Sequence, residues 1–365
     1  MGATVLNQRF SSLYRFVYLV TIIVVSQIGA RAQFITKTGT HLYVGNHEIR
    51  LYGGTLYLTY DGKQYLTGGA FASRSKAKEV DAYLQKWTAA AAKCHMNVLR
   101  VTDWLPTNSG WKNPEIYHQL DYLTKLDNQQ HIYTEIDLSA FRNWLTAHHK
   151  DAYDAANWRQ FIRYIGVHFR DNTDIAMYGI AGEVPAPNYK ATNPTAEQLI
   201  AFFKAVSSEL HRFDPNHLIS SGGFIFMDDP HSGIPWRRIF SLPDIQLAAI
   251  HAYAGSPTGV AGSAYRRVGS WANSKGIPFM VEEFGYHQNV GDGVRAGLFE
   301  ANYKYGKQYH AAGMIFWNWG GETTENDGSK TAMDVNPQTL LTYLTVSQNC
   351  ELRGLLYPGM SSLSK

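Results

Sequence analysis

The sequence is poor in cysteine. Among its 365 residues only Cys94 and Cys350 carry a thiol, which argues against a zinc site built from cysteines. Cys94 ends the first predicted helix and Cys350 ends the last. If the protein is exported and its fold places those helices side by side, the two thiols can form a disulfide that joins the ends of the chain. Two separate buried thiols are the alternative.

Motifs of several common enzyme classes are also missing. There is no Gly-x-Ser-x-Gly nucleophile elbow, no Walker phosphate loop and no His-Glu-x-x-His zinc helix. No glycosylation sequon is present, because Pro194 disrupts the one triplet that resembles it. The segment Asn326-Asp327-Gly328-Ser329 lacks the full ligand set of a calcium loop, so we interpret it as a turn. We therefore expect a reaction that needs neither a metal nor a cofactor.

The N-terminal segment differs from the rest of the chain. Two arginines precede an apolar run, 16–25, that is too short to span a bilayer comfortably. Ala30-Arg31-Ala32 then has the small-x-small pattern of a signal-peptidase site. We predict that residues 1–32 are a signal peptide and that the mature protein, 33–365, is secreted into the extracellular space or the periplasm. An uncleaved N-terminal anchor is the alternative.

Net charge is absent from the predicted mature chain. Of the 33 Lys and Arg residues, three lie in the first 32 positions, which contain no Asp or Glu. The remainder therefore has 30 basic and 30 acidic residues. A chain without a basic excess lacks the usual means of binding nucleic acid or an anionic membrane. We expect a neutral partner, no nucleic acid, no membrane contact after signal cleavage, and a monomer.

Strand-like and helix-like segments alternate along the mature chain, with no linker, repeat or low-complexity run between them. A short hairpin is predicted at 34–43. Eight strands are predicted to follow, at 49–53, 97–101, 132–136, 175–183, 217–221, 247–253, 277–281 and 314–317. Helical spacing appears at 80–91, 117–126, 158–169, 199–210, 265–272, 293–309 and 340–346. Thr195 and Gln198 form a capping box before the fourth of these helices. The alternation predicts one domain, a (β/α)8 TIM barrel preceded by a short N-terminal β-hairpin.

Two of the predicted strands are followed by glutamates. One leads to Glu183 and another to the pair Glu282-Glu283. Acids have little place at the end of a buried strand unless they face a site, and TIM barrels carry their chemistry at the C-terminal strand ends. A pair of carboxylates facing one cleft is what retaining glycoside hydrolysis requires. Simple salt bridges in loops are the alternative interpretation.

The chain resembles glycoside hydrolase family 5, and within it the endo-β-1,4-mannanase-like branch. The resemblance rests on Asn97-Val98-Leu99-Arg100, Asp214-Pro215-Asn216-His217-Leu218, Ile250-His251-Ala252-Tyr253 and Glu282-Glu283-Phe284-Gly285. Each motif is weak alone, but their order and spacing are specific together. They cover nearly the whole mature chain, from the opening hairpin to Phe316-Trp317.

The resemblance implies a role for each strand-end residue. Glu183 corresponds to the general acid/base and Glu283 to the nucleophile, because in the family the nucleophile directly precedes an aromatic-glycine pair. Glu282 then takes a supporting position. Arg100 is expected beside the nucleophile, lowering its pKa, while Glu183 stays protonated. The residues expected to contact substrate are Arg100, His251, Tyr253, Trp317, Trp319, Trp104 and Trp236, the last two as outer walls of the cleft.

One departure from the family pattern concerns the acid/base motif. The family has Asn directly before the acid/base and Pro after it, whereas this chain has Gly182 and Val184. The Asn normally holds the sugar 2-hydroxyl, a contact that strengthens in the transition state. The expected function is retaining hydrolysis of internal β-1,4 bonds in a neutral polysaccharide, first of all β-mannan or glucomannan. The alternatives are a β-glucanase or cellulase, an exo-β-mannosidase of the same fold, or a carbohydrate-binding pseudoenzyme that the Gly182 departure would explain.

Overall fold

The structure is a computed structural model that describes residues 33–57 and 71–319. The chain divides into two units, 1–33 and 34–365, and every helix and strand below belongs to the second. The predicted signal peptide, the predicted helix at 340–346 and Cys350 lie outside the described residues. Within the described residues, no helix is both long and apolar enough to cross a membrane.

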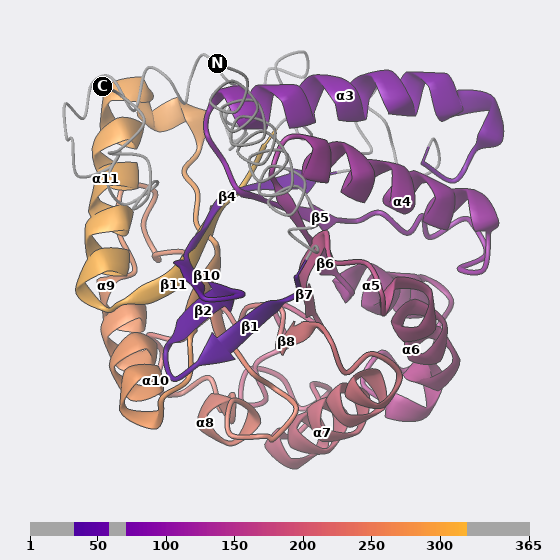
Figure 1. The fold of residues 1–365 in the computed structure, drawn as a ribbon. Helices are drawn as coiled ribbons and strands as arrows, with labels where there is room; N and C mark the ends of the chain where they lie inside the picture. The colour runs from indigo at the N-terminus through magenta and orange to yellow at the C-terminus, as the bar shows by residue number, and fades with distance from the viewer. Residues whose placement is uncertain (1–32, 58–70, 320–365) are drawn as a thin grey trace, which may run out of the picture. The chain divides into compact units, whose positions relative to one another are not determined.

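Eight parallel strands form the central sheet, and the predicted barrel is confirmed (Figure 1). Their order is β8-β7-β6-β5-β4-β11-β10-β9. Parallel bridges from Ser220 to Leu247 and from Phe224 to Ile250 join the two ends of this order, which closes the ring. The strands are β4 (Leu51–Tyr57), β5 (Val98–Thr102), β6 (Tyr133–Asp137), β7 (Ile175–Gly179), β8 (Leu218–Ser220), β9 (Ala248–His251), β10 (Phe279–Glu283) and β11 (Ala311–Phe316).

Helices follow the strands and surround the ring (Figure 1). They are α3 (Ala77–Lys93), α4 (Pro114–Gln129), α5 (Ser139–Ala147), α6 (Ala155–Phe169), α7 (Ala196–Phe213), α8 (Trp236–Ile239), α9 (Gly262–Ala264), α10 (Ser270–Lys275) and α11 (Asp292–Gln308). Short 3₁₀ turns lie at Arg74–Lys76 and Gln288–Val290, and a π-helical stretch, Tyr265–Gly269, joins α9 to α10. The predicted capping box is present, with the Thr195 side chain accepting from the Gln198 N–H and Gln198 accepting from the Thr195 N–H.

The N-terminal hairpin is longer than predicted. It is a three-stranded antiparallel sheet of β1 (Ile35–Thr38), β2 (His41–Val44) and β3 (His47–Ile49). The extra strand forms because the turn at Gly45-Asn46 returns the chain for a third pass, so the first barrel strand starts at Leu51 rather than Ile49. Gly39 and Gly45 both have the positive φ that such turns require.

This small sheet closes the N-terminal end of the barrel. Ile35 and Leu42 are buried in one apolar cluster with residues at the N-terminal ends of the barrel strands, such as Leu51, Val98 and Leu218. In Figure 1, β1 and β2 accordingly lie over the centre of the ring. Because this end is filled by apolar side chains, the C-terminal end is left for polar chemistry.

One of the motifs behind the family resemblance has a structural role. Asp214 accepts hydrogen bonds from the His217 ring at 2.7 Å and from the Tyr178 hydroxyl at 2.7 Å, with no exposed surface of its own. The His217 ring also packs edge-on against Phe34, 5.1 Å between centroids. These contacts connect the end of α7, the start of β8 and the N-terminal segment.

Candidate active site

A cavity of about 350 Å³ opens at the C-terminal ends of the barrel strands. Its walls come from β5, β6, β9 and β10, from the start of α5, and from the loops that follow β5, β7, β9 and β11. The lining residues are Arg100, Thr102, Asp103, Asp137, Ser139, Arg142, Asn143, Gly182, Glu183, His251, Tyr253, Glu283 and Trp317. All of the strand-end residues singled out in the sequence, except the buried Glu282, therefore share one cavity of a size suited to a small ligand.

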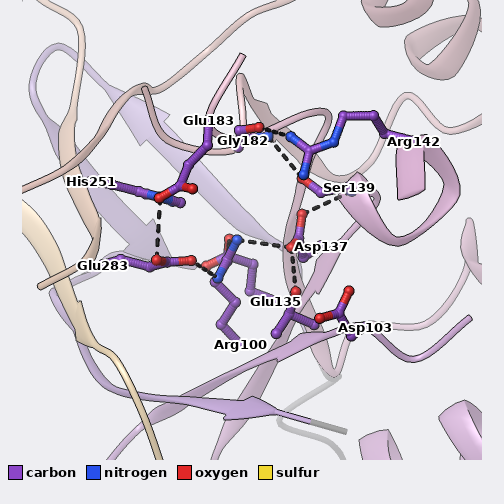
Figure 2. A network of polar contacts seen from close by, with 12 residues as sticks. Arg100, Asp103, Glu135, Asp137, Ser139, Arg142, Gly182, Glu183, His251 and Glu283 are labelled. Carbon is purple, nitrogen blue, oxygen red and sulfur yellow. Dashed lines mark hydrogen bonds and ion pairs between the residues drawn. The ribbon is translucent and has the colours of Figure 1, made fainter. Parts of the chain in front are cut away.

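Arg100 lies at the centre of the polar network (Figure 2). Its guanidinium is 2.6 Å from Glu283, 2.9 Å from Asp137 and 3.3 Å from Glu135, and its side chain is 1% exposed. A planar guanidinium can meet several carboxylates at once, which an ammonium group cannot do with the same geometry. Arg100 therefore fixes the position of Glu283 relative to the barrel wall.

Asp137 is the most strongly bound carboxylate of this network. It accepts from Arg100 Nη2, from Thr102 Oγ1 at 2.6 Å and from the Ser139 N–H at 2.9 Å. Burial alone would raise the pKa of Asp137, but Arg100 and these hydrogen bonds outweigh it and hold the pKa below its usual range. Asp137 is therefore the permanent counter-ion of Arg100.

Glu135 and Glu282 lie deeper, with no exposed surface. Burial raises the pKa of both, and for Glu135 the proximity of Glu282 adds to the effect. Removal from water disfavours the charged form of each carboxyl, and the Arg100 charge opposes this effect. The position of Glu282 below the cavity fits a supporting role.

Glu183, His251 and Glu283 form a compact cluster (Figure 2). His251 Nδ1 is 3.0 Å from Glu183 Oε1 and 3.3 Å from Glu283 Oε2. One ligand-type atom of each residue lies within 4.8 Å of those of the other two. Glu283 Oε2 also accepts from the Tyr253 hydroxyl at 3.0 Å. Both oxygens of Glu283 are thus held, one by Arg100 and one by Tyr253.

The two glutamates differ in solvent access. The Glu183 side chain is 42% exposed, whereas that of Glu283 is 8% exposed. A group that must exchange protons with a departing oxygen and then with water benefits from access, while a group that attacks carbon benefits from a fixed orientation.

The pKa shifts of the two glutamates are opposite to those expected from the sequence. Burial raises the pKa of Glu283, although His251 and Arg100 oppose it. Burial also acts on Glu183, but its hydrogen bond with His251 and the charges of His251, Arg142 and Arg100 lower its pKa overall. The expectation overlooked His251, whose own pKa is raised by the two carboxylates despite burial. At this contact the proton affinity of the imidazole is therefore raised and that of the Glu183 carboxyl is lowered.

Glu183 lies in the loop after β7 rather than at the strand end. Its backbone has φ 50°, a left-handed conformation that is uncommon for a residue with a side chain. The preceding Gly182 packs directly against Gly222, so that a Cβ on Gly182 would come 2.2 Å from the Gly222 carbonyl oxygen. The departure at position 182 therefore has a steric basis: this backbone has no room for the asparagine of the family pattern.

Three of the tryptophans predicted to contact substrate are buried in the core instead, so the prediction is wrong for these three. Trp104 is fully buried, stacks on Phe161 and donates its ring N–H to the Asp137 carbonyl oxygen at 2.8 Å. Trp319 is also fully buried and donates to the Trp87 carbonyl oxygen at 3.1 Å.

Trp236 is 4% exposed and packs edge-on against Trp271, 5.3 Å between centroids. All three rings fill the core between strands and helices. The periodicity of the sequence could not predict their burial, because each tryptophan lies in a loop or at the end of one. Trp317 differs: it is only half buried and lines the cavity.

Sequence reasoning missed one side of the site. Asp103, Asp137, Ser139, Arg142 and Asn143 line the cavity but were not singled out. The available signal was Asp137 itself, an acid at the end of a buried strand, with the polar residues Ser139, Arg142 and Asn143 within the next six positions. The adjacent β6 strand reads as an ordinary buried strand, and α5 begins two residues after it.

A metal ion would find a limited ligand set here. Glu183, His251 and Glu283 are the only group of this kind within the described part of the chain. Arg100 is already 2.6 Å from Glu283, so its charge opposes a cation at this position. The donor set fits proton transfer better than metal coordination.

Comparisons with known proteins agree with this geometry. A family model described as cellulase, glycosyl hydrolase family 5, matches residues 64–323. Mannan endo-1,4-beta-mannosidase 8 of Oryza sativa subsp. japonica is 26% identical over 159 residues, which is 37% of this chain and 41% of that protein. The chain thus spans about two fifths of the length of this curated relative.

Solved structures of the same fold include mannanases and a mannosidase. The endo-1,4-beta-mannanase from Rhizomucor miehei superimposes with a TM-score of 0.66 at 15% identity, covering 87% of this chain and 100% of that one. The exo-beta-1,4-mannosidase from Opitutaceae bacterium strain TAV5 gives 0.64 at 14% identity, covering 88% and 63%. The family match extends over most of the chain and includes the cavity residues, so this protein belongs to glycosyl hydrolase family 5.

Proposed function

We propose that the protein hydrolyses β-1,4 bonds within a mannan or glucomannan chain, with retention of configuration at the cleaved sugar. The observation that carries this proposal is the pair Glu183 and Glu283, whose nearest ligand-type atoms lie within 4.8 Å of each other. Retaining enzymes hold their two carboxyl groups about 5–5.5 Å apart, and inverting enzymes about 6.5–9.5 Å apart. A contact this close between one oxygen of each carboxyl fits the retaining separation better than the inverting one.

In the first step Glu283 is the nucleophile. A Glu283 oxygen attacks the anomeric carbon as the glycosidic C–O bond breaks, and the departing oxygen takes a proton from Glu183. Arg100 and Tyr253 hold the two oxygens of Glu283 at 2.6 and 3.0 Å and thereby aim the carboxylate. In the second step Glu183, now a base, removes a proton from water, the water oxygen bonds to the anomeric carbon, and Glu283 is released.

The acid proton of the first step comes from the hydrogen bond between His251 and Glu183. His251 Nδ1 lies 3.0 Å from Glu183 Oε1, and the two carboxylates raise the pKa of His251, so the imidazole can hold this proton before substrate binds. A bound sugar displaces water from the cavity, and removal of water disfavours charged forms. Transfer of the proton to Glu183 then converts an ion pair into a neutral pair, and Glu183 becomes the acid that the reaction requires.

The choice of a mannan-type substrate rests on the relatives. The curated relative from rice is named as a mannan endo-1,4-beta-mannosidase, and the Rhizomucor miehei structure as an endo-1,4-beta-mannanase. The half-buried Trp317 provides an apolar face on which a sugar ring can stack. Exo action is the second candidate, favoured by the similarity to the Opitutaceae exo-beta-1,4-mannosidase. The family name also includes cellulase, so β-glucans belong among the substrates to be tested.

The cellular setting is part of the proposal. A polysaccharide is too large to enter a cell intact, so export by the N-terminal segment agrees with the proposed substrate. We propose that the mature chain acts as a secreted monomer.

The test is reducing-sugar release by the mature protein on mannan, glucomannan, carboxymethyl cellulose and laminarin. Glu283→Ala is expected to abolish the release, and Glu197→Ala, a surface glutamate paired with Arg238, is the matched control that keeps it. Release from mannan as a series of short oligosaccharides supports endo action, whereas release of mannose alone supports exo action. Proton NMR of the first anomer formed tests retention. A well-folded protein that binds oligosaccharide without cleaving any of these glycans would contradict the proposal in favour of a pseudoenzyme.

A further inference from the structure

The loop that carries Glu183 lacks the side chain on which the family normally relies. Position 182 is glycine, and a Cβ there would lie 2.2 Å from the Gly222 carbonyl oxygen and 3.2 Å from the His251 ring. The first distance is shorter than real Cβ contacts, and its partner is backbone that cannot turn aside. A side chain that holds the Glu183 segment from the cavity side must therefore come from another element.

Arg142, on α5, reaches this segment (Figure 2). Its Nη1 donates a hydrogen bond to the Gly182 carbonyl oxygen. Its Nε and Nη2 donate to Asn143 Oδ1 at 3.2 and 3.1 Å, and Asn143 Nδ2 donates to Asp103 at 3.0 Å. These three side chains line the same cavity as Glu183. The guanidinium is thus held by its neighbour on α5 while it contacts the loop.

The contacted group is the peptide unit that leads into Glu183. A peptide unit is planar, so the Gly182 carbonyl and the Glu183 N–H move together. The carbonyl accepts from Arg142, and the N–H donates to the Gly223 carbonyl oxygen at 2.9 Å. Hydrogen bonds at both ends of one plane fix its orientation and thereby the direction in which the Glu183 side chain leaves the backbone.

The plane needs such support because of the Glu183 conformation. With φ at 50°, Glu183 occupies a region that costs of order 1–3 kcal/mol for a residue with a side chain and persists only when the surroundings hold it. Ser139 Oγ accepts from the Gly182 N–H at 2.8 Å and supports the preceding peptide unit. Arg142 supports the following peptide unit through its hydrogen bond to the Gly182 carbonyl.

We propose that Arg142 is a positioning residue for Glu183: by holding the Gly182 carbonyl it aims the acid/base at the leaving oxygen, in a loop where the amide of the family pattern is sterically excluded. The inference rests on the proposed function, because it assigns Arg142 a part in the proton transfer assigned to Glu183. It predicts a defect in leaving-group protonation rather than in attack by Glu283, which Arg142 does not contact in the described structure.

The test compares two substrates of the same sugar. A manno-oligosaccharide needs its leaving oxygen protonated, whereas a dinitrophenyl β-mannoside or mannobioside releases a phenolate that needs no proton. For Arg142→Met we expect kcat/KM on the oligosaccharide to fall about 10- to 100-fold, since a small misplacement can cost this much. On the dinitrophenyl substrate kcat/KM should fall less than about threefold, because this constant reports only the first step. Arg142→Lys, which retains one cationic donor, should lie between the variant and the parent, and Arg238→Met is the matched surface control.

Two results would overturn the inference while leaving the proposed function intact: equal losses on both substrates, or no loss on either. If the parent protein cleaves neither substrate, the proposed function fails, and a structural measurement still decides the inference. A crystal structure of Arg142→Met should show the Gly182–Glu183 peptide plane rotated and the Glu183 carboxyl moved away from His251. An unchanged plane would refute the role of Arg142.

Discussion

Arg100→Met is the substitution with the clearest consequence for stability. Methionine keeps most of the length and apolar volume of the arginine stem but removes the cation. In the protein that cation lies 2.6 Å from Glu283 and 2.9 Å from Asp137, and its side chain is 1% exposed. Removing one partner of a buried ion pair leaves an uncompensated charge and costs about 3–5 kcal/mol. We expect a loss of this size in the free energy of unfolding at neutral pH.

The loss should depend on pH, and its sign follows from Asp137. In the parent protein Arg100 and the hydrogen bonds from Thr102 and Ser139 together outweigh burial and hold the pKa of Asp137 below its unfolded value. This contribution to stability is present above the unfolded pKa, about 3.9, and is lost as pH falls through the folded one. Without Arg100, burial is opposed only by the hydrogen bonds from Thr102 and Ser139, so the pKa of Asp137 is higher in the variant than in the parent. The variant therefore loses stability relative to the parent as pH rises from about 4. The difference in the free energy of unfolding between parent and variant grows from acid to neutral pH.

Urea unfolding at several pH values between 4 and 7.5 measures this difference. Arg238→Met provides the matched control, because Arg238 forms a two-pronged pair with Glu197 in which both side chains are more than half exposed. Surface pairs of this kind contribute little, so the control should resemble the parent at every pH. A parent–variant difference that is independent of pH, or below about 1 kcal/mol at neutral pH, would contradict the reasoning on buried pairs.

Three further predictions test other parts of the structure. Gly182→Asn should destabilise the protein rather than restore a family contact, because its Cβ would lie 2.2 Å from the Gly222 carbonyl oxygen, and a variant with raised activity and parent-like thermal stability would contradict this. Trp317→Ala should raise KM with little effect on the free energy of unfolding, because Trp317 lines the cavity. Trp319→Ala should instead cost about 3–5 kcal/mol of stability, because its ring is fully buried. Equal effects of the two substitutions on KM and on stability would contradict these different roles. Asp127→Asn should gain stability relative to the parent as pH rises from about 4 to 7. Burial raises the pKa of Asp127 to about 7, so ionisation of Asp127 opposes folding of the parent over this range. A stability difference that stays constant with pH in urea unfolding would refute the raised pKa of Asp127.

Much of the fold was readable from the sequence. Strand–helix alternation is a local pattern, and eight repeats of it have one common closed solution, so the barrel followed from periodicity alone. The same logic placed Arg100, His251, Tyr253, Glu283 and Trp317 at strand ends, and all five line the cavity. The third strand of the N-terminal sheet was missed, because a three-residue strand has too little pattern to be separated from the barrel strand that follows it.

What the tertiary structure alone decided concerns contacts between distant segments. Whether a loop tryptophan faces solvent or the core depends on the helices packed behind it, so Trp104 and Trp236 could not be sorted by spacing. The order of the glutamate pKa values depended on His251, which lies 68 positions from Glu183 in the chain. Arg142 and Gly182 are 40 positions apart, and their contact exists because β6 and β7 pair in the sheet, which brings the loop after β7 beside α5. The sequence by itself determined which residues stand at strand ends, because that depends on periodicity along one segment. Burial, charge coupling and backbone clearance depend on neighbours from elsewhere in the chain, and only the folded barrel supplies those.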